Sequence, residues 1–184
     1  IEATGKIVIK SPERTAYGDQ GIYDLDQSVI VVEGKSLRLK TKLDTVTASD
    51  SLEYWEKRNI AIARGNATAI RGDKKISADT LNVQFARIDN DSVQAVQMDA
   101  SGGVTIMTPR EIVIGNEGIY DVVQGIVTLT GDVKITRGKS QLNGSMAEVN
   151  LQKGVSRLLS DEPLSGKNKV RGLFISEPKQ KKRE

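Results

Sequence analysis

The chain of 184 residues contains no cysteine and no histidine. Their absence excludes a disulfide framework, a thiolate or imidazole metal site, a cysteine nucleophile and a Ser–His–Asp triad. Aromatic residues make up only 4% of the chain, so few flat rings exist on which bases or sugars could stack. No motif in the sequence favours another kind of catalytic site. The sequence therefore predicts a protein that is not an enzyme and that uses no cofactor or metal.

Long apolar runs are also missing, and nothing in the sequence is long enough to predict a membrane-spanning helix. The first residue is not Met, which fits either the removal of an export signal or a trimmed chain, and the two are not separable. Basic residues gather at the C-terminus, so that residues 167–184 carry a net charge of +5 and the rest about −2. A near-neutral body does not favour nucleic acid as a partner, and 177–184 is expected to be a disordered basic tail.

What the sequence does contain is strict alternation of apolar and polar residues, the pattern of half-buried strands. Pairs of aliphatic residues two positions apart point to one face of each strand. Turn residues between these runs divide the chain into roughly fifteen short strands at the usual spacing of about 8–12 residues. Helical periodicity is absent, and the fold class expected is all-β.

A repeat supports this interpretation. Residues 18–34 align without gaps on residues 115–131, with seven of seventeen positions identical. Each unit is predicted to run as strand, turn, strand and then a corner closed by Gly34, Gly65, Gly103 or Gly131. Such a unit cannot bury its apolar face alone, so neighbouring units must share one continuous core. The phase breaks at Ile60 and Ile62, and the sequence leaves open which face these two take.

The corner sequences and their order resemble the OstA/LptA family of periplasmic lipopolysaccharide-transport proteins. The resemblance rests on Gly131–Ile135, on looser versions at Gly65–Ala67 and Gly103–Ile106, and on Leu142–Leu151. It implies an open β-jellyroll over residues 1–176, in which two facing antiparallel sheets enclose an apolar groove. It also implies a location in the periplasm, end-to-end self-association by strand pairing, and as partners an LptC-like inner-membrane protein and an LptD-like outer-membrane protein.

The ligand implied is lipopolysaccharide, whose lipid A acyl chains an aliphatic groove would shield. Burying a methylene group is worth about 0.8 kcal/mol. The hypothesised groove residues are Ile7, Ile9, Leu37, Leu39, Val104, Ile106, Val127, Leu129, Val133, Ile135, Val149 and Leu151. Candidate edge strands for self-association are the runs Ile7–Ile9 and Val170–Ile175.

Three alternatives stay open at this point. The chain could be an LptC-like component of the same pathway, whose membrane anchor has been removed. It could be a structural β-solenoid with a dry core, in which the same residues only pack together. A carbohydrate-active β protein is the third alternative, although no motif favours one.

Overall fold

The computed structural model describes residues 1–89, 92–159 and 171–173, and nearly all of them lie in strands. No helix in this part of the chain could cross a membrane. The strands are β1 (Glu2–Lys10), β2 (Arg14–Asp24), β3 (Val29–Glu33), β4 (Leu37–Thr41), β5 (Asp44–Ala48), β6 (Ser51–Trp55), β7 (Ile60–Arg71), β8 (Lys74–Asp89), β9 (Ser92–Met107), β10 (Ile112–Asp121), β11 (Ile126–Arg137), β12 (Ser140–Asn150), β13 (Val155–Leu159) and β14 (Arg171–Leu173). A short 3-10 helix, η1 (Glu56–Arg58), precedes β7.

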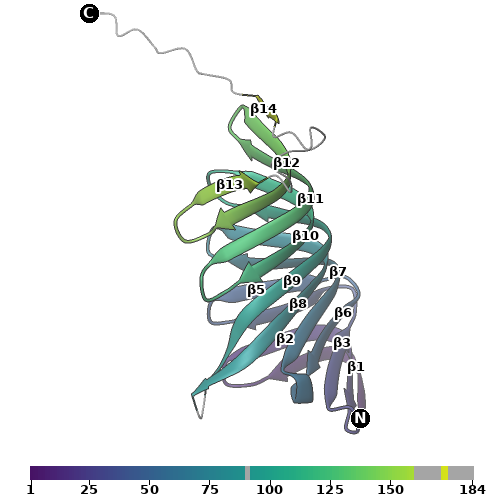
Figure 1. The fold of residues 1–184 in the computed structure, drawn as a ribbon. Helices are drawn as coiled ribbons and strands as arrows, with labels where there is room; N and C mark the ends of the chain where they lie inside the picture. Colours follow the sequence, from purple (N-terminus) through teal and green to yellow (C-terminus); the bar gives the residue numbers. More distant parts are fainter. Residues whose placement is uncertain (90–91, 160–170, 174–184) are drawn as a thin grey trace, which may run out of the picture.

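All fourteen strands belong to one antiparallel sheet, stacked from β1 near the N-terminus to β13 and β14 at the opposite end (Figure 1). The long strands bend near their middle, and the short ones pair with only one half of them. One half of β2 pairs with β3 and the other with β4, and β7 divides in the same way between β6 and β5. The sheet therefore folds into two facing walls.

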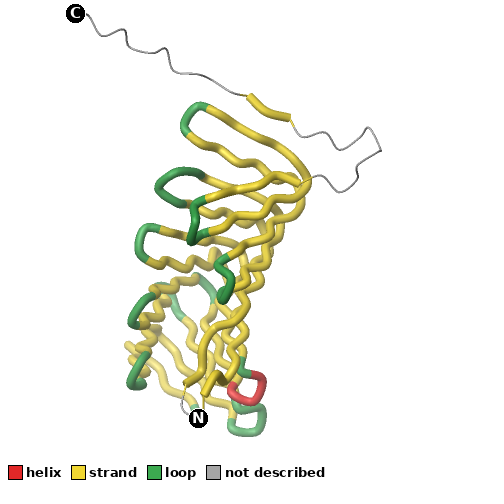
Figure 2. Tube along the Cα trace, turned by 60° about the vertical axis from the view of Figure 1, so that its left-hand side comes forward, coloured by secondary structure: helices red, strands yellow, loops and turns green. Residues whose placement is uncertain are grey.

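We name these walls by their segments. Wall A comprises 7–10, 14–18, 37–41, 44–48, 67–71, 74–78, 104–107, 112–115, 133–137, 140–144 and 171–173. Wall B comprises 2–4, 20–24, 29–33, 51–55, 60–64, 80–89, 92–101, 117–121, 126–130, 146–150 and 155–159. In Figure 2 the upper strands draw together along one side, where the chain passes between walls, and spread apart toward the loops.

The corner between the walls contains a bulge in every second long strand of the stack from β7 onward, namely in β7, β9 and β11. Gly65–Asn66, Gly102–Gly103 and Gly131–Asp132 all have positive φ, and the register shifts at each of them. Two residues in the left-handed region turn the strand and increase its twist, which glycine permits at least cost. The corner is thus formed by residues inside the strands and not by a loop between them.

An acidic or amide side chain of the neighbouring strand fills the space beside each corner glycine. A Cβ added at Gly65 would meet Asp50, and the same holds for Gly102 with Asp79 and for Gly131 with Asn116. Gly102 and not Gly103 therefore occupies the crowded corner position, because a Cβ at Gly103 would meet nothing. The sequence alignment had placed that corner one residue too late.

The all-β jellyroll expected from the sequence is confirmed, with two differences in detail. The described residues form fourteen strands, close to the roughly fifteen expected, and several are longer than expected because the corners lie inside them. The two facing sheets are halves of one continuous sheet. Ile60 and Ile62 point outward, since the buried Ala63 has the opposite parity. The proposed tail, 177–184, lies outside the described residues.

Replacing Gly65 by Ala tests the corner. Ala at φ +80° is strained, and its Cβ would collide with Ser49 and Asp50, so we expect a loss of about 3 kcal/mol in the free energy of unfolding. Gly138→Ala is the matched control, because its φ is +56° and its Cβ would meet nothing; it should cost about 1 kcal/mol. Urea denaturation measures both, and equal losses would show that crowding at the corner does not matter.

Candidate functional site

The inner face of wall A carries an unbroken aliphatic row. Successive strands place apolar residues directly opposite one another, from the first strand to the twelfth. The row is Ile9, Ala16, Leu39, Val46, Ala69, Ile76, Ile106, Val113, Ile135 and Leu142, each paired with the next. No polar side chain interrupts it, so the row forms a continuous apolar stripe along the sheet.

Wall B carries a second row that faces the first. It runs Ala3, Gly21, Val32, Leu52, Ala63, Leu81, Ala100, Gly118, Leu129, Ala147 and Leu158, again with each residue paired to the next. From Leu52 onward large residues are mostly separated by small ones, which lets the two walls interdigitate. A Cβ at Gly118 would come 3.6 Å from Val104 of wall A, so the walls touch across the interior.

All twelve residues hypothesised from the sequence lie on the inner face of the folded sheet. Nine are buried, among them Val104, Ile106 and Leu129 with no exposed surface at all. Ile7, Ile9 and Leu39, near the N-terminal end, are only half-buried. The interior is therefore closed at its centre and more open toward the N-terminal strands.

Several inner residues were missed by reasoning from the sequence. They are Ala16, Val32, Val46, Leu52, Ala63, Ala69, Ile76, Leu81, Ala100, Val113, Leu142, Ala147 and Leu158. The same two-residue spacing could have found Val32 with Ile30 and Leu81 with Val83. Alanines and glycines give no apolar signal of their own, and only the register shows that they share the rows.

The mouth of the interior, at the ends of the strands farthest from the corners, differs between the walls. On wall A the next inward positions are charged, including Arg14, Asp44, Arg71 and Arg137. On wall B they form a row of mainly aromatic and aliphatic residues: Tyr23, Ile30, Tyr54, Ala61, Val83, Met98, Tyr120, Val127 and Val149. The interior is thus lined by aliphatic residues near the corners and by both charged and apolar residues at its mouth.

Arg14 of wall A reaches across the mouth at the N-terminal end. Its guanidinium carbon lies 5.1 Å from the ring centre of Phe85 and 5.6 Å from that of Tyr54, both in wall B. The two rings pack edge to face, with centroids 6.3 Å apart. A cation over aromatic faces contributes about 0.5–1 kcal/mol at a partly exposed site, so this clasp is weak enough to open.

Glu111 bridges the mouth at the C-terminal end. Its carboxylate is buried, accepts a hydrogen bond from Ser156 of wall B, and pairs with Arg137 of wall A at 2.8 Å. The turn before it is closed by the backbone N–H of Thr108, which donates to the Glu111 carbonyl oxygen. A buried carboxylate without these partners would be costly, so Glu111 ties the edge strand β13 to wall A.

Tyr120 lies between these two bridges, close to the bidentate pair of Arg71 and Asp44. Burial raises the pKa of the Tyr120 hydroxyl; Arg71 opposes this, while Asp44 and Asp121 add to it. The tyrosine is therefore neutral at physiological pH, and the middle of the mouth carries no net charge from it. Within the described residues no cluster of His, Cys, Asp or Glu could hold a metal ion.

Comparison with known proteins identifies the family of this chain. Residues 46–155, more than half of the chain, match the family model described as the LptA/(LptD N-terminal domain) LPS transport protein. The chain belongs to this family. The resemblance inferred from the corner sequences is thereby confirmed, and the family is one of transport proteins.

A solved structure has the same fold as this LptA-type chain. It is LptH, the LptA-homologous periplasmic component of the lipopolysaccharide transport device of Pseudomonas aeruginosa. The two align with a TM-score of 0.61 at 16% sequence identity, over 72% of this chain and 95% of LptH. No curated protein sequence matches the chain significantly.

Glu111 offers a test of the mouth in this LptA-family chain. Glu111→Ala leaves Ser156 and Arg137 without their acceptor and should lower the free energy of unfolding by about 1–3 kcal/mol. Glu111→Gln keeps an acceptor of similar shape and should cost less. Glu117, exposed on the outer face, supplies the control, since Glu117→Ala should stay within about 0.5 kcal/mol of the parent. Equal urea midpoints for Glu111→Ala and Glu117→Ala would contradict the bridge.

Proposed function

We propose that this protein binds lipopolysaccharide in the periplasm and passes it toward the outer membrane, shielding the lipid A acyl chains between its two walls. The observation that carries the proposal is the pair of facing rows, which run from β1 to β12 on wall A and from β1 to β13 on wall B and contain no polar side chain. A conduit needs apolar surface that is continuous along its length. An ordinary core needs only enough apolar surface to be stable.

The chemistry of the mouth fits the other part of such a ligand. Arginines recognise phosphate groups well because their planar donors match phosphate oxygens. Arg14 and Arg71 stand at the mouth of wall A, above the aliphatic rows. An amphipathic lipid would thus find an apolar interior for its chains and cationic donors for a phosphorylated head.

The closed centre sets a condition on this function. Val104, Ile106 and Leu129 have no exposed surface, so acyl chains enter there only if the walls separate. The aliphatic area exposed by separation is the area that the chains would cover. Binding energy is therefore partly spent on opening, which keeps affinity modest and permits release.

End-to-end assembly is part of the proposal. β1 pairs only with β2 in the described part of the chain, and β13 and β14 pair only with β12. These edges lie at opposite ends of the stack (Figure 1). An unpaired edge accepts another strand readily, so a second copy, an LptC-like protein or an LptD-like protein could each continue the sheet. Of the run Val170–Ile175, only 171–173 are described.

A photo-crosslinking residue in place of Ile135 tests the lipid path. We expect a covalent adduct with lipopolysaccharide in a Gram-negative host that expresses the protein, because Ile135 faces the interior. Thr136 is the control, since it follows directly and faces outward. The readout is a shifted band that reacts with anti-lipopolysaccharide antibody.

Adducts at Thr136 as strong as those at Ile135 would place the lipid outside the walls. No adduct at Ile135, nor at the neighbouring inner position Val133, would favour the structural solenoid with a dry core. The buried centre of the interior is also compatible with such a dry core.

The absence of cysteine allows a direct test of assembly. Lys10 and Leu173 stand at the two ends of one outward row of wall A, so stacking that continues the row brings Lys10 of one copy beside Leu173 of the next. Lys10→Cys mixed with Leu173→Cys should give disulfide-linked dimers on mild oxidation. Thr45→Cys mixed with Leu173→Cys should not, because β5 is paired on both sides. Dimers of Leu173→Cys with itself alone would indicate a symmetric arrangement instead.

A further inference from the structure

The outward face of wall A carries positive charge only. Its two rows consist of Val8, Tyr17, Arg38, Thr47, Thr68, Ser77, Thr105, Ile114, Lys134 and Asn143, and of Lys10, Thr15, Lys40, Thr45, Ile70, Lys75, Met107, Ile112, Thr136, Gln141 and Leu173. Five of these are Lys or Arg and none is Asp or Glu. Within the described residues, none of the five cations takes part in a salt bridge.

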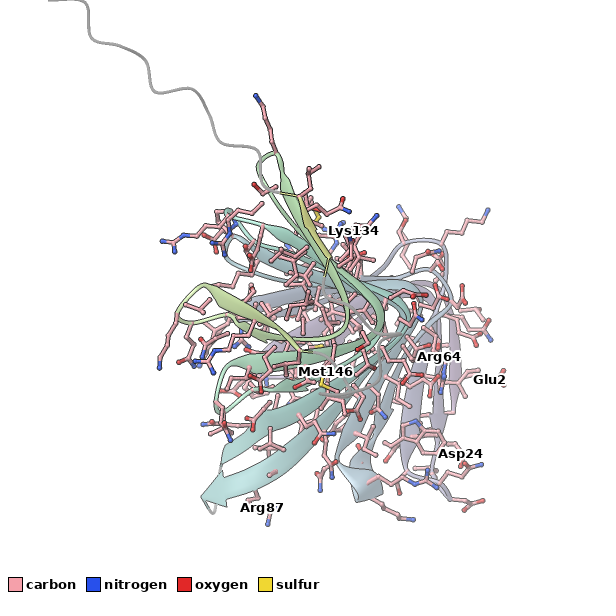
Figure 3. All side chains as sticks on the ribbon, turned by 45° about the horizontal axis from the view of Figure 1, so that its top comes forward. Glu2, Asp24, Arg64, Arg87, Lys134 and Met146 are labelled. Atoms are coloured by element: carbon pink, nitrogen blue, oxygen red, sulfur yellow. The ribbon has the colours of Figure 1, made fainter. Side chains whose placement is uncertain are left out.

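The corresponding face of wall B has the opposite charge. Two of its three outward rows hold Glu2, Glu33, Glu53, Asp99, Glu117 and Glu148 against Arg64 and Arg157, and the third holds Asp24 and Asp121 and no Lys or Arg. Figure 3 labels Lys134 of wall A and Glu2 and Arg64 of wall B. The near-neutral chain therefore has one cationic side and one acidic side.

Exposed apolar side chains lie among the cations of wall A. Tyr17 is next to Arg38, and Ile114 is next to Lys134. Met107 and Ile112 face each other across two neighbouring strands and are 40% and 38% exposed. Solvent-exposed aliphatic groups interspersed with unpaired Lys and Arg, without acids, are the composition of surfaces that lie on anionic lipid.

We propose that the outward face of wall A, which we call the cationic face, docks on the surface of an anionic phospholipid bilayer. Its four lysines and Arg38 contact lipid phosphates, and Tyr17, Met107, Ile112 and Ile114 enter the headgroup region. The acidic face of wall B is repelled by the same surface, so the protein binds in one orientation. This inference rests on the outer faces and does not depend on what fills the interior.

A second copy presenting its acidic wall is the competing occupant. It would satisfy the cations, but it would cover the exposed apolar groups of the cationic face only where its own, such as Ile119 at 54% exposed among the carboxylates, lay directly opposite. A bilayer satisfies both kinds of side chain, because phosphates lie just above an apolar region. The bilayer is therefore the better match in chemistry.

The test is flotation of the full chain with phosphatidylcholine vesicles, with or without about one third phosphatidylglycerol. The protein should float with the anionic vesicles only, and less so at high salt because surface attraction is screened. Arg38→Glu, Lys40→Glu and Lys134→Glu combined should lower the vesicle partition coefficient by at least about tenfold, since each basic residue near an anionic surface contributes on the order of 1 kcal/mol. Circular dichroism checks that the variant folds; the three Gln substitutions are the milder variant if it does not.

The matched control reverses the same number of charges elsewhere. Lys57, Lys153 and Arg157 are exposed and lie in or next to wall B, and their replacement by Glu changes the net charge equally. This control should still float. If both variants lose flotation equally, net charge alone drives binding to the vesicles. If the wall A variant still binds fully, another basic segment is responsible for the binding. If the parent does not float but self-associates in a salt-dependent way, and the wall A variant loses this self-association, then a second copy binds the cationic face. Each of these three results overturns the proposal.

Discussion

The fold depends on one constraint, which is that each long strand must turn from one wall into the other without leaving the sheet. Two consecutive residues with positive φ achieve this at Gly65–Asn66, Gly102–Gly103 and Gly131–Asp132. A short polar side chain from the neighbouring strand, such as Asp50 beside Gly65, fills the place that a Cβ would take. Each corner therefore positions the next, and the two walls stay aligned along the whole stack.

Register follows from the corners. Because side chains alternate with a period of two, a slip by one residue would exchange the inner and outer faces of a strand. Such a slip in β11 would bring Lys134 into the interior and send Ile135 to the surface. The same fixed register that joins the aliphatic rows inside therefore gathers cations on one outer face and acids on the other. The register of the strands therefore determines both the apolar interior and the distribution of charge on the outer faces.

The sequence predicted the strands, the corners and the twelve inner residues because alternation and repetition are local signals. It placed one corner at Gly103 instead of Gly102, since an alignment cannot tell which of two glycines meets a neighbouring side chain. Arg14 and Glu111 could not be found, because their partners Phe85 and Ser156 come from distant strands. The charge separation was equally hidden, because Arg38 and Lys134 are far apart in the sequence and only the register of the strands brings them to one outward row.

How the walls could part follows from where the hydrogen bonds lie. Ladder bonds run along each wall, from strand to strand, and among the described residues no ladder joins the segments of wall A to those of wall B across the interior. The walls are joined by the chain at the corners, by apolar packing within, and by the side-chain contacts of Arg14 and Glu111 at the mouth. Bending at the corners would therefore open the interior without breaking the sheet. Opening removes apolar contacts between the walls, and the acyl chains of the proposed ligand would replace them with similar apolar contacts. The free energies of the occupied and the empty interior need therefore differ little. A small difference is what a carrier requires, since it must both take up its lipid and give it away.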